Sequence, residues 1–160
     1  MNLNSEEINI NEPSKIHSSA RNYLQLGFSI IPVGKNKTPL IGWKKYQTEK
    51  PTTEQIEEWF SKPRVNIGLI TGQISGVGVV DIDIDKLTGK FSPEAEELMQ
   101  KLPPTLISIT GGGGRHYFYR LTKPLKSYNG IMKGVDIKAD GGYVILPPSV
   151  HESGREYQYE

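Results

Sequence analysis

Hydrophobic and polar positions follow two different periods along this chain, which together predict helices and strands. Apolar residues at helical spacing predict one helix over residues 16–26, a second capped by Thr52 or Thr53 and a third over 92–102. Runs rich in β-branched and aromatic residues predict strands over residues 28–33, 66–72, 76–85, 105–110, 116–120, 135–138, 143–146 and 155–159. The mixed order of strand pairs and crossover helices predicts an α+β fold, a sheet covered by helices.

Glycine-bearing turns separate two of the predicted strand pairs. One such turn joins the strands over residues 66–72 and 76–85. The segments 135–138 and 143–146 are expected to form a hairpin-like pair across the sequence Ala139-Asp140-Gly141-Gly142.

Length and composition narrow the class of protein. The 160 residues fit one domain, expected over residues 15–160 after a flexible leader over residues 1–14. The absence of cysteine excludes disulfides, thiolate nucleophiles and cysteine-based zinc sites. Neither a signal peptide nor a membrane-length apolar stretch is present, so we expect a cytoplasmic protein without a membrane partner. A net charge of +1 confines any nucleic-acid contact to a local patch.

The sequence Asp81-Ile82-Asp83-Ile84-Asp85 follows an apolar run and carries a strong chemical signal. Because side chains alternate along a strand, the three aspartates are expected on one face, where they repel unless a cation lies between them. Such carboxylates suit Mg²⁺ or Mn²⁺, with a phosphate-bearing substrate completing the coordination. The alternative is a strand that runs into solvent, with Asp85 as a turn or cap residue.

Asp136 lies in another apolar strand, where an acidic residue usually faces solvent at a sheet edge. If that strand neighbours the one that carries Asp81 and Asp83, three carboxylates would surround a pair of metal ions. Two-metal phosphoryl transfer requires this arrangement.

Four consecutive glycines, at positions 111–114, separate two predicted strands. Such a run loses much conformational entropy on folding, so it needs a structural reason. It is either a flexible hairpin loop or a backbone whose N–H groups approach phosphate oxygens. A lone histidine at a strand start is usually structural, but beside this loop we favour a ligand role for His116. The predicted nucleotide ligands are Gly112, Gly113, Gly114, Arg115 and His116. Asp140 either contacts the same ligand or only caps its own turn.

Lysines and aromatic residues are mixed between positions 35 and 46. Such mixtures can hold a single strand through phosphate contacts and base stacking, whereas the alternative is a solvated loop with a buried tryptophan. The candidate template contacts are Lys35, Lys37, Trp43 and Lys44.

In this order, several segments resemble the bifunctional DNA primase/polymerase (Prim-Pol) domain of the archaeo-eukaryotic primase superfamily. They are Gly-Trp-Lys at 42–44, Asn-Ile-Gly-Leu at 66–69, Asp-Ile-Asp at 81–83, Thr-Gly-Gly-Gly-Gly-Arg-His at 110–116 and Gly-Val-Asp-Ile-Lys-Ala-Asp-Gly-Gly-Tyr-Val-Ile-Leu-Pro-Pro-Ser at 134–149. The resemblance covers nearly the whole chain from Ile16 onwards. It implies an RRM-like catalytic sheet joined to an N-terminal α/β unit.

The resemblance also implies a function, a template-directed nucleotidyltransferase that joins (d)NTPs and releases pyrophosphate. Asp81, Asp83 and Asp136 would hold two Mg²⁺ or Mn²⁺ ions, and His116 would bind the nucleotide; a register of Asp83 with Asp85 stays open. DNA template and primer would be its partners, with a C-terminal helicase module in a longer replication protein of a mobile element. Zinc-bearing insertions, found in some members, are excluded here because cysteine is absent. Two alternatives are a two-metal nuclease and a catalytically weak nucleotide- or single-strand-binding replication-initiator module.

Overall fold

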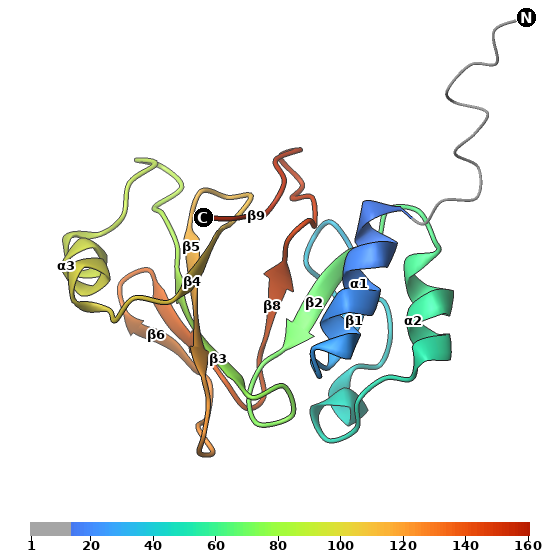
Figure 1. Cartoon of the computed structure of the whole chain (residues 1–160). Helices are drawn as coiled ribbons and strands as arrows, with labels where there is room; N and C mark the ends of the chain where they lie inside the picture. The colour runs from blue at the N-terminus through green and yellow to red at the C-terminus, as the bar shows by residue number, and fades with distance from the viewer. Residues whose placement is uncertain (1–13) are drawn as a thin grey trace, which may run out of the picture.

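The computed structural model describes residues 14–160 of the chain, which form helices and two antiparallel sheets and so confirm the α+β class (Figure 1). The elements are α1 (Lys15–Gln25), β1 (Ile30–Val33), the 3-10 helix η1 (Lys44–Gln47), α2 (Thr53–Phe60), β2 (Asn66–Ile70), β3 (Val77–Ile82), α3 (Pro93–Lys101), β4 (Leu106–Ile109), β5 (Arg115–Arg120), β6 (Tyr128–Met132), β7 (Val135–Lys138), β8 (Tyr143–Leu146) and β9 (Gln158–Tyr159). Most of the leader expected over residues 1–14 lies outside the described residues. Across the described range, no helix combines the length and the apolar character needed to span a membrane.

The three α-helices begin where the sequence predicts, because each has a side chain that caps its first turn. The Ser14 hydroxyl accepts a hydrogen bond from the first turn of α1. At α2, Thr52 and Gln55 form a reciprocal capping box, and at α3 the Ser92 hydroxyl accepts from the Ala95 N–H. These contacts satisfy backbone N–H groups that have no partner within the helix.

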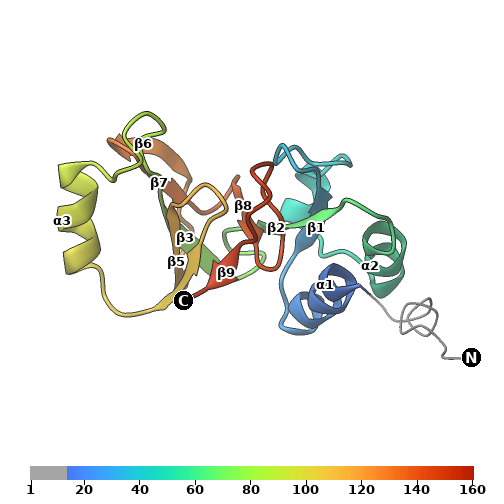
Figure 2. The same ribbon diagram turned by 90° about the horizontal axis from the view of Figure 1, so that it is seen from above.

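The strands form a three-stranded sheet in the order β1-β2-β8 and a six-stranded sheet in the order β6-β7-β3-β5-β4-β9. Helices α1 and α2 lie on the outer side of the three-stranded sheet and α3 lies on the outer side of the six-stranded sheet, as the two views show (Figures 1 and 2). The inner faces of the two sheets therefore lie toward each other.

Side-chain alternation gives the six-stranded sheet two different faces. Ile82, Tyr117 and Val135 join α3 in one buried apolar cluster. The alternate positions, including Val79, point toward the three-stranded sheet, and Val79 joins the larger core that α1 and α2 cover. A polar residue at one of these alternate positions consequently faces the space between the sheets.

Three sequence-based strand predictions are corrected. Strands β7 and β8 do not form a hairpin, because β7 pairs with β3 while β8 crosses to the other sheet and pairs with β2. Strand β3 ends at Ile82 rather than at residue 85, and the last strand covers only Gln158–Tyr159. Strand β6, which pairs with β7 through a bulged register, was not predicted.

Candidate functional site

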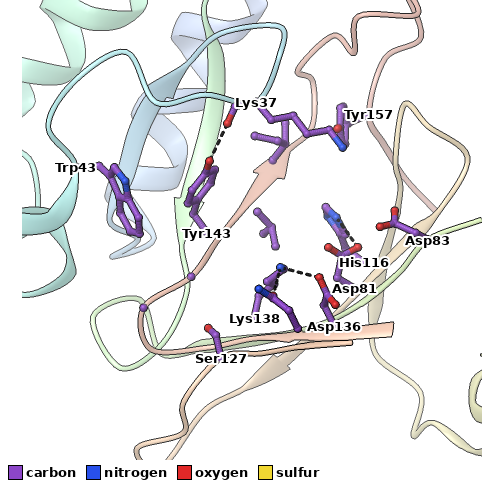
Figure 3. A pocket seen from close by; sticks show the side chains of 15 residues that line it. Lys37, Trp43, Asp81, Asp83, His116, Ser127, Asp136, Lys138, Tyr143 and Tyr157 are labelled. Carbon is purple, nitrogen blue, oxygen red and sulfur yellow. Dashed lines mark hydrogen bonds and ion pairs between the residues drawn. The ribbon is translucent and has the colours of Figure 1, made fainter. Parts of the chain in front are cut away.

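A cavity of about 390 Å³ lies between the two sheets and collects polar side chains from both (Figure 3). We call it the acidic cavity. Its lining residues are Lys37, Trp43, Asp81, Asp83, His116, Ser127, Asn129, Asp136, Lys138, Gly141, Gly142, Tyr143, Val144, Ile145 and Tyr157. Six of the sequence-predicted site residues line it, namely Lys37, Trp43, Asp81, Asp83, His116 and Asp136.

Strand register places three of these residues in one row across the six-stranded sheet. Asp81 on β3 lies opposite Asp136 on β7 and opposite His116 on β5. The strands that carry the two aspartates are thus neighbours, as the sequence analysis required for a shared site. Because directly paired residues point to the same face of a sheet, all three side chains face the acidic cavity.

Asp81 and His116 form the buried centre of the row, with side chains only 15% and 7% exposed. Asp81 Oδ1 lies 3.3 Å from His116 Nε2, an ion-pair contact. Among the described residues, Asp81 Oδ1 and His116 Nδ1 nevertheless lack any hydrogen-bond partner. Burial alone would raise the pKa of Asp81, but the adjacent His116 and the charges of Lys138 and Lys37 hold that pKa below its ordinary value. Asp81 is therefore an ionised, buried carboxylate whose Oδ1 has only the long His116 contact and no hydrogen bond of good geometry.

Asp83 lies just beyond the end of β3 and is more exposed than Asp81. Partial desolvation and the negative charges of Asp81 and Asp136 raise the pKa of Asp83, although the charge of Lys37 opposes them. This repulsion shows that the three carboxylates share one electrostatic environment, which a cation would relieve.

Asp136 has protein partners for both of its carboxylate oxygens. Lys138 Nζ donates to Oδ2 over 2.8 Å, and the Gly130 N–H donates to Oδ1 over 2.6 Å. As the side chains stand, residues 14–160 contain no group of three or more histidine, aspartate or glutamate side chains arranged to hold a metal ion. The donor set still fits a hard divalent cation chemically, because Asp81 offers an unsatisfied buried oxygen beside two more carboxylates.

A second cavity, of about 790 Å³, adjoins the first, since Lys37 and Asp83 line both. We call it the basic cavity, because Lys37, Lys86 and Arg155 surround it and only Asp83 and Glu152 oppose them in charge. His151 and Gly112 also line it. Burial and the positive charges of Lys37, Arg155 and Lys86 lower the pKa of His151, with Glu152 opposing them. The surroundings of His151 are thus cationic overall.

Only part of the predicted nucleotide loop reaches either cavity. Gly112 lines the basic cavity, whereas the N–H groups of Gly113 and Gly114 donate to the carbonyl and hydroxyl oxygens of Thr110. Arg115 lies on the face opposite His116, where its guanidinium stands over the Phe91 ring and contacts Glu160. Alternation along β5 explains this placement, because adjacent residues of a strand point to opposite faces.

Asp140 and Asp85 both accept hydrogen bonds from backbone N–H groups outside the acidic cavity. Asp140 accepts from Gln73 and Leu125, at 2.8 and 3.1 Å. Asp85 lies past the end of β3 and accepts from Leu87 and Thr88, and the two N–H groups lower the pKa of Asp85. The predicted sharing of one face by three aspartates thus extends only to Asp81 and Asp83, because Asp83, just past the end of β3, still lines the acidic cavity whereas Asp85 accepts hydrogen bonds within the following turn. Asp85 is the turn residue that the alternative interpretation described.

The candidate template contacts separate into two groups. Lys37 and Trp43 line the acidic cavity, and Trp43 packs edge-to-face against Tyr143 with ring centroids 5.2 Å apart. Lys35 and Lys44 are exposed and line neither the acidic nor the basic cavity.

Sequence reasoning missed three residues that line the acidic cavity, Lys138, Tyr143 and Tyr157. Lys138 follows Asp136 by two positions on the same strand, so alternation already indicated a shared face. Tyr157 lines the same cavity as the carboxylates, and burial together with the charges of Asp81 and Asp83 raises the pKa of its hydroxyl. No local pattern marks Tyr157 or Tyr143, because long-range chain crossing brings them to the site.

Comparison with known proteins supports the resemblance found in the sequence. Residues 20–160 match the family described as Prim-Pol, bifunctional DNA primase/polymerase, N-terminal. No curated protein matches the chain.

Proposed function

The chain belongs to the bifunctional DNA primase/polymerase N-terminal (Prim-Pol) family, and from this premise we propose that its two adjoining cavities carry out template-directed nucleotidyl transfer. The family indicates a primase/polymerase-type nucleotidyltransferase. The single observation that most supports the proposal is Asp81, an ionised buried carboxylate with an unsatisfied oxygen, between Asp136 and His116. A purely structural sheet position has no reason to keep such a group.

Asp81, Asp83 and Asp136 would hold Mg²⁺ or Mn²⁺. Two such ions, when bound, would lower the pKa of the attacking hydroxyl and stabilise the negative charge of the departing pyrophosphate. The protein's own contribution is a set of carboxylates held close together, in which Asp81 stays ionised despite its burial. His116 orients Asp81 by contacting its Oδ1 and would present its imidazole to the nucleotide.

The basic cavity is the proposed site for the triphosphate. Lys37, Lys86 and Arg155 offer cationic donors, and the glycine loop contributes the open edge at Gly112. Since Asp83 lines both cavities, a triphosphate bound in the basic cavity would lie next to the carboxylates of the acidic cavity. This proposal replaces Arg115 as a phosphate ligand, because its side chain lies on the other face of the sheet.

The opposite wall of the acidic cavity would accommodate a base or the template strand. Trp43 and Tyr143 form an aromatic pair there, from the three-stranded sheet and its loop. Stacking on aromatic faces binds single strands with little dependence on sequence. With a net charge of +1, template binding should be weak and should decrease steeply with salt.

The topology supports the RRM-like nature of the catalytic sheet. Elements β3, α3, β4 and β5 follow the β-α-β-β order with which ferredoxin-like and RRM folds begin. Strand β7 then pairs with β3 and completes the four-stranded arrangement β7-β3-β5-β4.

The proposal is tested by incubating the chain with labelled dNTPs, Mg²⁺ or Mn²⁺, and a primed template. We expect primer lengthening that Asp83→Asn reduces on the order of a hundredfold, by analogy with other losses at metal sites. Asp85→Asn is the matched control, an aspartate two positions away that caps a turn, and its activity should stay within about twofold of the wild type.

Three outcomes would contradict the proposal. Shortening of the primer without added nucleotides would identify a nuclease. Nucleotide binding without incorporation at any metal concentration would identify a binding module. An equal loss in Asp85→Asn would place the metal ligands at a different register.

A further inference from the structure

Lys138 lies inside the acidic cavity, where its ammonium contacts a carboxylate that the proposed function assigns to a metal ion. Lys138 Nζ lies 2.8 Å from Asp136 Oδ2 and 2.8 Å from Asn129 Oδ1. The Lys138 side chain is only 19% exposed, so this is a partly buried ion pair rather than a surface one. Figure 3 shows the ammonium on the side of Asp136 that faces the cavity.

The same contact explains why the carboxylates do not form a ready metal cluster. Asp136 already has a donor on each oxygen, from Lys138 and from the Gly130 N–H. A divalent cation bound to Asp136 would have to replace one of these donors. The backbone N–H of Gly130 is fixed by strand β6, whereas the lysine stem has four rotatable carbons. Lys138 is therefore the donor that can leave.

Electrostatics favours the same exchange. In the ion-free protein the Lys138 ammonium contacts Asp136 beside Asp81 and Asp83, where uncompensated carboxylates would repel one another. Once a doubly charged ion is bound, the ammonium would instead be repelled at short range. Asn129, on the neighbouring strand, already accepts a hydrogen bond from Lys138 and carries no charge, so this partner does not compete with a cation.

We propose that Lys138 is a built-in counter-ion, which holds Asp136 in the ion-free protein and is displaced when a divalent cation binds. This inference rests on the proposed function, because it requires that the cation bind at these carboxylates. Lys138 is in this sense a positioning residue, which acts on the metal site through Asp136.

The first test measures Mn²⁺ affinity by calorimetry for the wild type, Lys138→Met and Lys37→Met. Removing the competing ammonium should tighten Mn²⁺ binding by on the order of fivefold, the scale of one partly exposed ion pair. Lys37→Met removes a charge that acts on Asp81 and Asp83 in the same cavity without contacting Asp136, so it should tighten Mn²⁺ binding clearly less than Lys138→Met does. Lys138→Arg, which keeps the charge and the donors, should bind Mn²⁺ like the wild type.

Each other outcome rejects a distinct claim. If the wild type binds Mn²⁺ and Lys138→Met binds it equally or less tightly, the counter-ion role is wrong while the metal site stands. If Lys37→Met tightens binding as much as Lys138→Met, only the general field of the cavity matters and the counter-ion role is again wrong. If no variant binds Mn²⁺, both the proposed metal site and the role of Lys138 are rejected.

A second measurement needs no substitution and so does not depend on a variant that folds. In a Mg²⁺ titration followed by NMR, the Lys138 side-chain signals and the Gly130 amide signal report the two donors to Asp136. We expect both to shift with one common midpoint. Mg²⁺-dependent shifts at Asp81 and Asp83 with an unchanged Lys138 signal would overturn the displacement.

Discussion

At the scale of single residues, Gly114 shows how closely the glycine loop approaches the acidic site. A Cβ atom at this position would lie 2.5 Å from the Ile82 carbonyl oxygen and 3.2 Å from Asp83 Cα, both on the backbone that ends β3. A real side chain cannot fit without moving that backbone. Gly112, two positions earlier, has no heavy atom closer than 3.8 Å to its notional Cβ.

Gly114→Ala should therefore destabilise the protein by about 1–3 kcal/mol, the usual cost of forcing a methyl group into a packed site. Gly112→Ala should change the free energy of unfolding by less than about 0.5 kcal/mol. Urea unfolding of the two variants measures the difference. Equal stabilities would mean that the loop is not packed against the end of β3.

The acidic residues of the site could be predicted because their signal is local, whereas their surroundings could not. Asp81 and Asp136 stand in apolar runs that any strand pattern reveals, and their pairing needed only that the two strands be neighbours. Arg115 was assigned to the ligand through its place beside His116, although alternation puts adjacent residues on opposite faces. The glycine run indicated that the backbone closely approaches another group. The sequence suggested a ligand as that group, whereas at Gly114 it is the backbone at the end of β3.

At the scale of elements, α1 and α2 are joined by a cluster of ionic side chains. Arg21 on α1 makes two hydrogen bonds to the Glu57 carboxylate on α2, at 2.5 and 2.6 Å. His17 Nε2 lies 2.9 Å from the same carboxylate. The hydrogen bonds from Arg21, with His17 nearby, lower the pKa of Glu57 from 4.5 to about 2.

This lowered pKa predicts how stability depends on pH. A carboxyl whose pKa is depressed in the folded state stabilises that state above its ordinary pKa and loses the contribution as pH falls toward the folded value. Glu57→Gln should hence be less stable than the wild type at pH 6, and the difference should shrink between about pH 4.5 and pH 2. Urea midpoints at a series of pH values measure it.

Glu58→Gln serves as the control, because Glu58 is on the same helix and only approaches Lys62 at 4.0 Å on an exposed surface. Its urea midpoint should follow the wild type at every pH. A pH-independent difference for Glu57→Gln would show that the effect is lost packing rather than lost charge.

Element prediction succeeded where short-range chemistry decides and failed where distant strands compete. Helix starts at Thr52 and Ser92 are visible because caps are local signals. The hairpin predicted across Asp140-Gly141-Gly142 has suitable turn residues, yet β2 takes β8 as its partner instead. Strand β6 lacks an alternating pattern, since most of its residues are exposed and its register is bulged. Its existence depends on pairing with β7.

At the scale of the whole molecule, Asp140 links two distant segments of the chain at the point where the chain passes from one sheet to the other. Its carboxylate accepts from Gln73, just after β2, and from Leu125, just before β6. The neighbouring Ala139 carbonyl oxygen accepts from the Thr71 hydroxyl at 2.7 Å. These contacts fix the connection between the sheets that enclose the acidic cavity.

Asp140→Ala should lower the free energy of unfolding by about 1–2 kcal/mol, because two backbone N–H groups lose their acceptor. Asp140→Asn retains one acceptor oxygen and should lose less. Urea unfolding measures the free energy of unfolding of both variants. Their nucleotide affinity is measured separately, in buffer without urea. A fall in nucleotide affinity with unchanged stability would instead support the ligand contact that the sequence suggested for Asp140.

The return of β8 to the three-stranded sheet determines how late in chain synthesis the acidic cavity can form. Ile67, in the centre of that sheet, donates its N–H to the Ser149 hydroxyl, 82 residues further along the chain. During synthesis on the ribosome, β1 and β2 can pair with each other, but the other edge of β2 has no partner until β8 emerges, and contacts over such separations form slowly. The wall of the acidic cavity that Tyr143 provides is therefore missing until residues 143–146 have emerged. Only then can the two sheets enclose the cavity from both sides.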